Sequence, residues 1–266
     1  MAALNETFVE TTDVKEQQRK SSSRPSVAEA LAEAIFSGHY QPGDFVPKEL
    51  ALCEEFAINR SAVRSDLRQL VDVGIIERIS GHGSKVRDYA DWNILDPQVT
   101  EWMTRYAAPN PKVQREILTF RLDVEPYVAM TAAKRATARD LVALEEAYEG
   151  MGQNLHNATS PEERRLHSDY DVAFHAAIFK ATHNIVWSQL SHILRPSIYL
   201  LVSMSNVSET DDPAESLERH RQLMECIRAR QPREAFRAAQ RVLAGTAKAL
   251  GLDAPETSLG RGVELD

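Results

Sequence analysis

Residues 59–74 read NRSAVRSDLRQLVDVG, and this stretch decides the fold. Asn59 or Ser61 can begin a helix here, because a short polar side chain accepts a hydrogen bond from a free N–H group of the first turn. Apolar residues then recur at helical spacing up to Val73. Gly74 suits the left-handed position that follows a helix end. The stretch therefore predicts an amphipathic helix that closes at Gly74.

Two shorter helices are predicted upstream of this one. Ser26, with Glu29 three positions later, is typical of a capping box, and the helical spacing that follows stops at residues 37–38. Residues 41–44 read QPGD, which predicts a turn. Pro47 then suits the opening of the second helix.

Downstream of Gly74 the hydrophobic period changes from helical to strand-like. Residues 75–79 and 84–87 are short strand-like segments, and the bend Gly81-His82-Gly83 supplies the backbone freedom for a hairpin between them. Three short helices followed by a two-stranded hairpin are the layout of a winged helix-turn-helix.

The rest of the chain reads as helix. Helices are predicted over residues 95–106, 111–135, 137–153, 161–181, 185–203, 214–229 and 232–250. Because no alternating strand pattern interrupts them, we expect an all-helical bundle with its own core. The fold class is therefore mainly α. The expected domains are a flexible arm over 1–25, a winged helix-turn-helix over 26–90, an all-helical domain over 91–254 and a tail over 255–266.

The composition of the 266 residues excludes several classes of protein. Hydrophobic residues make up 43% and charged residues 26%, which is ordinary for a globular chain but not for a disordered one. No apolar run approaches the roughly 18 residues of a membrane span, and charges interrupt any secretory signal in residues 1–25. Cys53 and Cys226 cannot form a disulfide framework. We therefore expect a cytoplasmic protein without a membrane partner.

Three arginines form a stripe along the third predicted helix. Arg60, Arg64 and Arg68 recur every four residues, in a chain whose net charge is −8. A planar guanidinium can donate to phosphate oxygens or to the O6 and N7 acceptors of guanine, and Ser61 can donate to phosphates. The alternative is a solvated face whose arginines pair with neighbouring acids, namely Asp66, Asp72 or Glu77. The helix-turn-helix context favours contact with double-stranded DNA.

The N-terminal region resembles the winged helix of the GntR family. The resemblance covers residues 26–87 and rests on PGDFVPKEL at 42–50, RSAVR at 60–64 and GSKV at 83–86, together with Leu67, Leu70, Gly74 and Gly81. Leu50 stands where many members carry an arginine, so we expect a different operator preference.

The resemblance implies that Arg60 and Arg64 contact DNA from the recognition helix, and that a wing tip over residues 80–82 reaches the minor groove. The candidate DNA-binding residues are Arg60, Ser61, Arg64, Arg68, Ser80, Gly81 and His82.

A second group of polar residues lies in the helical region. Asp171 and His175 are four residues apart, so their side chains share one helix face, and His167 extends this row by one turn. Carboxylate and imidazole groups arranged in this way can chelate a divalent cation. The same spacing also occurs on solvated faces, and spacing alone leaves both interpretations open.

Residues 95–250 resemble the all-helical effector domain of the FadR subfamily, which is called FCD. The residues that carry the resemblance are Asp171, Phe174, His175, Asn184, Leu190, Glu218, Arg219 and His220. The resemblance implies a metal such as zinc inside the bundle, held by Asp171, His175 and His220. The fourth family ligand falls on Val242, which cannot coordinate a metal. The site is therefore either a three-ligand site completed by water and effector, or a site without metal whose polar residues contact the effector directly.

Arg121 matches a family arginine that commonly holds an effector carboxylate. A guanidinium suits this role because the two planar groups pair through parallel hydrogen bonds. The alternative is a surface pair with Asp123 or Glu125. Residues 91–99 with Trp102 resemble the opening of the galactonate-operon repressor branch, whose effectors are sugar acids. The candidate effector-binding residues are Arg121, Asp171, His175 and His220.

The sequence therefore predicts a transcriptional regulator and not an enzyme. We expect a homodimeric repressor that binds palindromic operator DNA, because a two-fold symmetric protein matches a two-fold symmetric site. A small carboxylate, such as the sugar acid galactonate, is expected to bind within residues 91–254 and release the operator. One alternative is a same-family regulator of a different carboxylate. The other is a metal-dependent enzyme built on Asp171, His175 and His220, although no recognisable general-base motif accompanies them.

Overall fold

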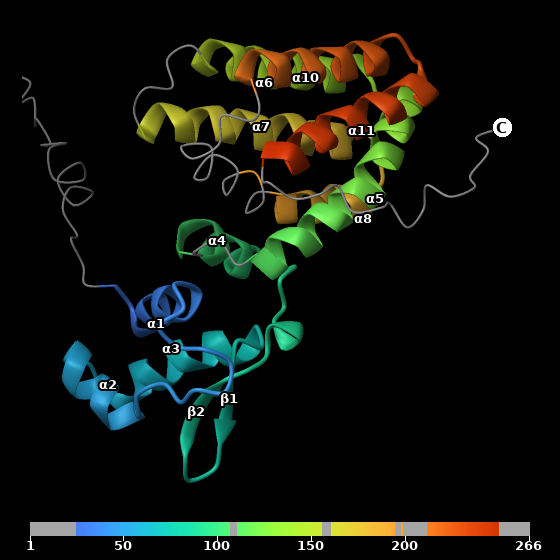
Figure 1. The fold of residues 1–266 in the computed structure, drawn as a ribbon. Helices are drawn as coiled ribbons and strands as arrows, with labels where there is room; N and C mark the ends of the chain where they lie inside the picture. The colour runs from blue at the N-terminus through green and yellow to red at the C-terminus, as the bar shows by residue number, and fades with distance from the viewer. Residues whose placement is uncertain (1–24, 107–110, 156–160, 195–197, 199–211, 250–266) are drawn as a thin grey trace, which may run out of the picture.

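The computed structural model describes residues 25–106, 111–155, 161–194, 198 and 212–249. These residues form two lobes, an N-terminal one that ends in a hairpin and a C-terminal bundle of helices (Figure 1). The mainly α fold class and the N-terminal winged helix-turn-helix are confirmed. The predicted arm, apart from Pro25, and the predicted tail lie outside the described residues.

Short polar side chains determine where the helices of the N-terminal lobe begin. The helices are α1 (Val27–Phe36), α2 (Glu49–Phe56) and α3 (Arg60–Asp72). Ser26 caps α1 by accepting a hydrogen bond from Glu29 N at 3.1 Å, as the capping box predicted. Asn59 rather than Ser61 caps α3, through Ala62 N at 2.9 Å. The start of α2 lies two residues beyond the predicted one at Pro47.

Two strands follow α3 and form the wing. They are β1 (Ile76–Ile79) and β2 (Gly83–Val86), which pair in antiparallel fashion. Ile76 lies opposite Val86, and Ile79 lies opposite Gly83. The φ angle of Gly83 is +117°, a conformation that is strained for any residue with a side chain, so the predicted bend depends on this glycine.

The middle of α3 and the residue pair after it are tied to other segments of the lobe. Asp66, midway along α3, accepts a hydrogen bond from Val27 N at 2.9 Å and so helps to cap α1. Beyond the C-terminal end of α3, Gly74 has a φ of +76°, and a Cβ atom there would lie only 2.4 Å from Asp91 O. The backbone after α3 therefore packs directly against the turn that follows the hairpin.

The C-terminal lobe is a layered bundle of helices. After the 3₁₀ turn η1 (Tyr89–Asp91), its elements are α4 (Pro97–Tyr106), α5 (Pro111–Arg135), α6 (Ala138–Leu155), α7 (Pro161–Ala181), α8 (Ile185–Leu190), η2 (Ser191–Ile193), α10 (Pro213–Arg228) and α11 (Pro232–Ala249). In Figure 1, α6 and α10 lie above α7 and α11, and α5 runs from α4 along the bundle. None of the described helices combines the length and the apolar character that crossing a bilayer requires.

One predicted helix is interrupted. Residues 185–203 were expected to form a single helix, but α8 gives way to the 3₁₀ turn η2. Ser191 Oγ donates to Ser188 O at 2.8 Å, and such a side-chain bond competes with the carbonyl acceptors that a continuing helix uses. His192 Nε2 also lies 2.6 Å from Leu95 O, which ties the turn to the segment before α4. Most of the remaining predicted span lies outside the described residues.

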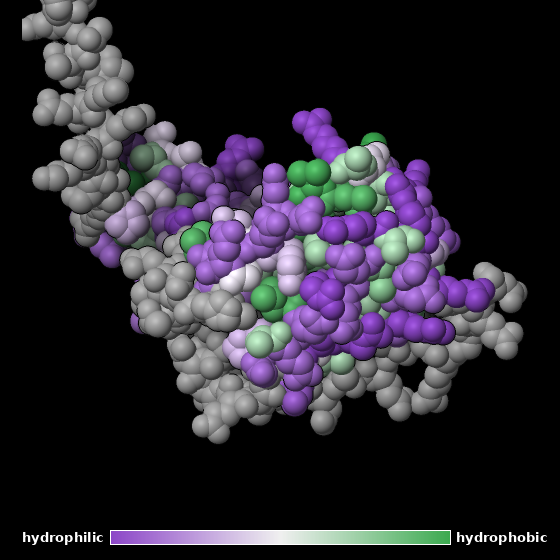
Figure 2. Space-filling model, turned by 90° about the horizontal axis from the view of Figure 1, so that it is seen from above, coloured by the Kyte–Doolittle hydropathy of each residue, from purple (hydrophilic) through white to green (hydrophobic). Residues whose placement is uncertain are grey.

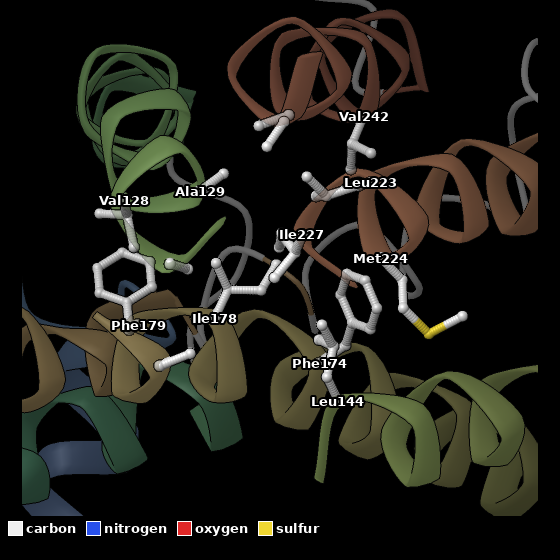
Figure 3. Close-up of a cluster of buried hydrophobic side chains, with 14 of the residues drawn as sticks. Val128, Ala129, Leu144, Phe174, Ile178, Phe179, Leu223, Met224, Ile227 and Val242 are labelled. Atoms are coloured by element: carbon white, nitrogen blue, oxygen red, sulfur yellow. The ribbon is translucent and has the colours of Figure 1, made fainter. Parts of the chain in front are cut away.

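A large apolar cluster holds the bundle together (Figure 3). It includes Val128, Ala129, Leu144, Phe174, Ile178, Phe179, Leu223, Met224, Ile227 and Val242. Helices α5, α6, α7, α10 and α11 each contribute to it, so burial of apolar surface stabilises their arrangement. Seen from above, the described outer surface is mostly hydrophilic, with apolar residues in small groups (Figure 2).

Helix α4 joins the two lobes. Glu29 of α1 accepts hydrogen bonds from Trp102 Nε1 at 2.9 Å and from Arg105 NH1 at 2.6 Å, and also from the Tyr106 hydroxyl. Trp102 and Trp92 are buried in the same apolar cluster as the residues of α1 and α3. The lobes thus share packed residues around α4, and the domain boundary after residue 90 stays a prediction.

Candidate functional site

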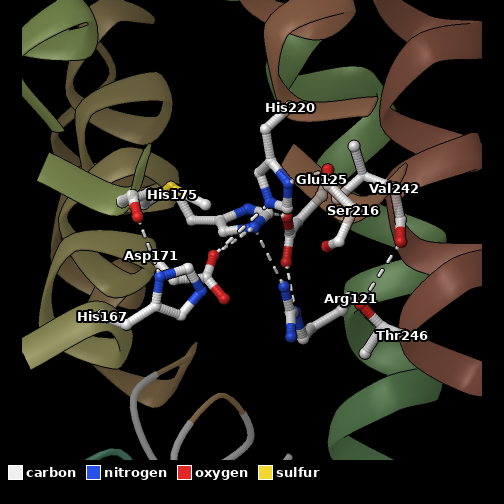
Figure 4. Close-up of polar contacts among 10 residues, drawn as sticks. Arg121, Glu125, His167, Asp171, His175, Ser216, His220, Val242 and Thr246 are labelled. Carbon is white, nitrogen blue, oxygen red and sulfur yellow. Dashed lines mark hydrogen bonds and ion pairs between the residues drawn. The ribbon is translucent and has the colours of Figure 1, made fainter. Parts of the chain in front are cut away.

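A polar cluster lies inside the C-terminal lobe, next to its apolar core (Figure 4). Arg121 and Glu125 come from α5, Asp171 and His175 from α7, and His220 from α10. On α5 and on α7 the two residues are one helical turn apart, so both side chains leave the same face. The structure therefore brings together all four residues that the sequence predicted for effector binding.

Glu125 links the members of this cluster, although the sequence suggested it only as a surface partner. Arg121 Nε donates to Glu125 Oε1 at 2.6 Å, and His175 Nδ1 donates to Glu125 Oε2 at 2.7 Å. The side chains of Arg121 and Glu125 are only 1% and 6% exposed. The four-residue spacing of Arg121 and Glu125 was enough to suggest from the sequence that they pair. Their burial could not be predicted in this way, because it depends on packing against the other helices.

Three potential metal ligands converge in the cluster. His175 Nε2 and His220 Nε2 lie 3.4 Å and 3.5 Å from the same oxygen, Asp171 Oδ1. The Nδ1 atoms lie beside acceptors, at 2.7 Å from Glu125 Oε2 and 2.8 Å from Ser216 O, which assigns the protons to Nδ1. Both Nε2 lone pairs then face Asp171, and His175 Nε2 also lies 3.4 Å from Arg121 NH2. Three acceptors directed at one another repel unless positive charge lies among them.

Two of these acceptor atoms are buried without a hydrogen-bond donor. Asp171 Oδ1 and His220 Nε2 are buried, and neither has a hydrogen-bond partner. The ligand atoms of Asp171, His175 and His220 all lie within 4.8 Å of one another. Buried polar atoms are rarely left unsatisfied, so their convergence fits a bound cation.

The charges of the cluster perturb one another. Burial raises the pKa of Glu125, but the positive charges of Arg121 and His175 outweigh it and lower that pKa to about 2. Burial lowers the pKa of His175, but the charge of Glu125 and the neighbouring Asp171 carboxylate raise it to about 9. Burial raises the pKa of Asp171, but the adjacent imidazoles of His175 and His220 hold it well below its usual value. A proton on His175 and a cation between neutral imidazoles are thus two ways of placing positive charge there.

Two neighbouring positions do not add a ligand. His167 Nδ1 lies 3.1 Å from Met151 O on α6, and the group that could hold a metal, among the described residues, does not include His167. Val242 on α11 is buried in the apolar cluster, and Thr246 Oγ1 one turn later donates to Val242 O at 3.3 Å (Figure 4). The position of the fourth family ligand therefore offers only a hydrocarbon side chain.

The predicted DNA-binding arginines lie on the exposed side of α3. Arg64 Nε donates to Glu49 Oε2 at 2.9 Å, and Glu49 Oε1 lies 3.2 Å from Arg78 NH1 on β1. Arg68 pairs with Asp72 at 3.6 Å, which is one of the pairs expected for a solvated helix face. The Arg68 side chain is 79% exposed. Of the other acids proposed as partners, Asp66 helps to cap α1 instead, while the ion pairs found in the described part of the chain do not include Glu77.

Arg60 and Ser61 are exposed at the start of α3, and the ion pairs of the described residues do not involve Arg60. Ser80, Gly81 and His82 are exposed at the tip of the wing, where His82 Nδ1 lies 3.0 Å from Ser80 O. The recognition helix and the wing tip are thus both accessible, and their assignment as DNA contacts stays a prediction.

Comparisons with known proteins match both lobes to regulator families. The family described as bacterial regulatory proteins, gntR family, matches residues 24–86, and the FCD domain family matches residues 116–245. In the solved structures, the chain is similar to Lar, which controls expression of the Listeria monocytogenes agr system. Their TM-score is 0.58 at 16% identity, covering 85% of this chain and 95% of that one, and shows a shared fold.

Similar proteins of known name are also regulators. The chain is 30% identical over 220 residues to the galactonate operon transcriptional repressor of Escherichia coli strain K12, covering 83% of this chain and 93% of that protein. It is 29% identical over 221 residues to the Glc operon transcriptional activator of the same strain, covering 80% and 83%. The matching families and relatives are transcriptional regulators and not enzymes. The chain therefore belongs to the GntR family of bacterial transcriptional regulators, in the FadR subfamily that carries an FCD domain.

Proposed function

We propose that this regulator is a cytoplasmic homodimeric repressor whose operator binding is released by a small carboxylate, with a sugar acid such as galactonate as the favoured effector. One observation carries the proposal: Arg121 is buried beside three residues whose donor atoms converge inside an FCD bundle. The similarity to the galactonate operon transcriptional repressor supports the class of effector. We assign DNA binding to residues 26–90, and effector binding and dimerisation to residues 91–254.

A divalent cation such as zinc fits the donor set of Asp171, His175 and His220. The support is the pair of buried, unsatisfied acceptors, Asp171 Oδ1 and His220 Nε2. Because Val242 adds no donor, three protein ligands would leave coordination positions for water or effector. When bound, the metal would supply positive charge and attract an anionic, hydroxyl-bearing ligand.

The charges of the cluster suit a carboxylate. Arg121 contributes one positive charge, and Glu125 and Asp171 contribute two negative ones. A divalent cation held by neutral imidazoles would leave the loaded cluster with one net positive charge, which a monocarboxylate neutralises. The Arg121 guanidinium matches a planar carboxylate, and imidazole and carboxylate groups match the hydroxyls of a sugar acid.

Contacts between packed elements connect this cluster with the recognition helix. Helix α7, which carries Asp171 and His175, packs against η2, and His192 of η2 binds the backbone before α4. Trp102 of α4 donates a hydrogen bond to Glu29 of α1, and Asp66 of α3 accepts one from the first residue of α1. We propose that an effector acting on α7 changes the position of α3 through these contacts.

On the DNA side, we propose that α3 enters the major groove and that the wing reaches the minor groove. The contacts we assign are Arg60, Ser61, Arg64 and Arg68 on α3 and Ser80, Gly81 and His82 at the wing tip. Their exposure supports this assignment, because an operator needs accessible donors.

Calorimetry tests the effector class. The full chain is titrated with a panel of sugar acids that includes galactonate, before and after treatment with a chelator, and its metal content is measured by elemental analysis. We expect one acid to bind, and Arg121→Ala to weaken that binding by about 2–5 kcal/mol because the carboxylate loses its charged partner. Arg115→Ala, at an exposed position of the same helix, is the matched control and should bind like the wild type.

Each part of the proposal has its own contrary outcome. Equal affinity of Arg121→Ala and the wild type for the acid that binds would end the carboxylate-clamp role. If no sugar acid binds, the sugar-acid class of effector is excluded. Metal that survives in His220→Ala would exclude His220 as a ligand, because two protein ligands rarely hold a metal. An acid that strengthens operator binding would contradict the release of the operator by the effector.

A further inference from the structure

Glu49 occupies an unusual place on the face that carries the arginines. It is the first residue of α2, yet its carboxylate contacts one arginine from the recognition helix and one from the wing. Oε2 accepts from Arg64 Nε of the recognition helix at 2.9 Å, and Oε1 lies 3.2 Å from Arg78 NH1 of the wing strand β1. The Glu49 side chain is 23% exposed, whereas those of Arg64 and Arg78 are 59% and 45% exposed. One carboxylate thus holds two partly exposed guanidinium groups.

A negative charge at this position opposes binding to a polyanion. Burial raises the pKa of Glu49, but the hydrogen bond from Arg64 and the charges of Arg64 and Arg78 lower it, so the carboxylate stays ionised at neutral pH. It neutralises positive charge that would otherwise attract phosphates of any sequence. If affinity for DNA alone mattered, an uncharged residue would serve better.

The orientation of Arg64 shows what the carboxylate provides. Arg64 donates to Glu49 through Nε, which lies on one side of the guanidinium group, and a bidentate contact with guanine can use the NH1 and NH2 groups at its end. A guanidinium fixed in one plane loses less freedom when it makes that contact. We propose that Glu49 is a positioning residue that orients Arg64 for reading a base and reduces the attraction of Arg64 and Arg78 to phosphates of unrelated sequence.

The proposal rests on the proposed function, in which Arg64 faces the operator. It predicts that Glu49 acts on discrimination more than on affinity. Without the carboxylate, both arginines should bind phosphates of any sequence more tightly, while the oriented contact with the preferred base should weaken. A side chain that only stabilised the fold would lower both affinities together, and one that only added negative charge would shift both equally.

The experiment uses the full chain and DNA duplexes of two kinds. Selection from a random duplex library with the wild type yields its preferred duplex, and a scrambled duplex of equal composition serves as the competitor. Dissociation constants for both are then measured at several salt concentrations for the wild type, Glu49→Gln and Glu49→Asp. We expect Glu49→Gln to reduce the ratio of preferred to scrambled affinity roughly tenfold, with tighter binding to the scrambled duplex. Glu49→Asp, which keeps the charge, should recover part of the ratio.

Glu54→Gln is the matched control, because Glu54 is an exposed acid on the same helix and is not part of the ion pairs found among the described residues. It should shift both affinities together and leave their ratio unchanged. If Glu49→Gln also leaves the ratio of the two affinities unchanged, the positioning role is overturned.

Arg64→Ala distinguishes a failure of the proposed function from a failure of the positioning role. If that variant keeps full affinity for the preferred duplex, the assignment of Arg64 to the DNA face fails; if it loses affinity while Glu49→Gln keeps the ratio, only the positioning role fails.

Discussion

Two arginine–carboxylate pairs made of the same chemical groups lie in opposite environments. The side chains of Arg64 and Glu49 are 59% and 23% exposed, whereas those of Arg121 and Glu125 are 1% and 6% exposed. An exposed pair contributes about 0–1 kcal/mol because water competes for both groups. Removing one partner of a buried pair costs about 3–5 kcal/mol because the other charge is left unpaired. The exposed pair can therefore exchange partners when DNA binds, whereas the buried pair changes only when a ligand supplies equivalent charge.

The largest effect is expected for the buried pair. Glu125→Ala leaves both Arg121 and His175 without their shared carboxylate, so we expect the C-terminal lobe to lose about 3–5 kcal/mol of stability. Denaturant unfolding followed by circular dichroism measures this loss. Glu145→Ala is the control, since Glu145 pairs with Arg228 at 2.9 Å but both side chains are largely exposed, at 47% and 39%. A change of similar size in the two variants would show that burial does not distinguish these pairs.

A smaller effect is expected on the exposed side, and in binding rather than in folding. Arg60→Ala and Arg64→Ala should each weaken operator binding by about 1–3 kcal/mol if the side chain contacts a base. If it contacts a phosphate, the slope of the logarithm of the binding constant against the logarithm of the salt concentration should fall by about 1. Fluorescence anisotropy with the selected duplex measures both quantities. Arg139→Ala, at an exposed position of α6, should bind like the wild type. Unchanged affinity in both α3 variants would exclude these arginines from the interface.

The smallest effect concerns Glu29, whose environment is intermediate. Its side chain is 24% exposed. Burial raises its pKa, but hydrogen bonds from Tyr106 and Trp102 and the charge of Arg105 lower it below the ordinary value of 4.5. A carboxyl group whose pKa is lower in the folded protein stabilises the fold at pH values above its pKa in the unfolded chain. This contribution is lost as the pH falls through the pKa of the folded state. Glu29→Gln should therefore cost about 1 kcal/mol at neutral pH and progressively less in acid.

Thermal melts of this variant between neutral pH and acid give the test. Glu33→Gln, at an exposed position of the same helix, is its control and should cost less at neutral pH. A difference between Glu29→Gln and the wild type that persists unchanged in acid would mean that the ionised carboxylate does not contribute.

Local chemistry made most of the fold predictable. The capping of α1 by Ser26 and of α3 by Asn59 follows from side chains that bond backbone groups three residues away. The pairing of Asp171 with His175 follows from the helical repeat in the same way. The early end of α8 was not predicted, because it involves His192 and the backbone of Leu95, which lie 97 residues apart in the sequence.

The sites show the same division between local and distant contacts. The spacing of Arg121 and Glu125 was readable, but their burial depends on α7, which supplies His175. Glu49 was not recognised as the partner of Arg64, because acids nearer in the sequence seemed equally suitable and the folding of α2 against α3 decides between them. The missing fourth ligand at Val242 was visible in the sequence from the family resemblance, and the structure adds that this valine is buried in the apolar cluster.

The close approach of Gly74 to Asp91 has a consequence for engineering chimeric regulators. A Cβ atom at Gly74 would lie 2.4 Å from Asp91 O, and Trp92 and Trp102 pack into the core of the N-terminal lobe. A chimera joined near residue 90 would transplant the DNA-reading module without the segment against which its recognition helix is packed. A junction placed after Tyr106 keeps that segment, together with the donors to Glu29, in its native surroundings. The unit that can be exchanged between regulators of this architecture is therefore the winged helix with α4 attached.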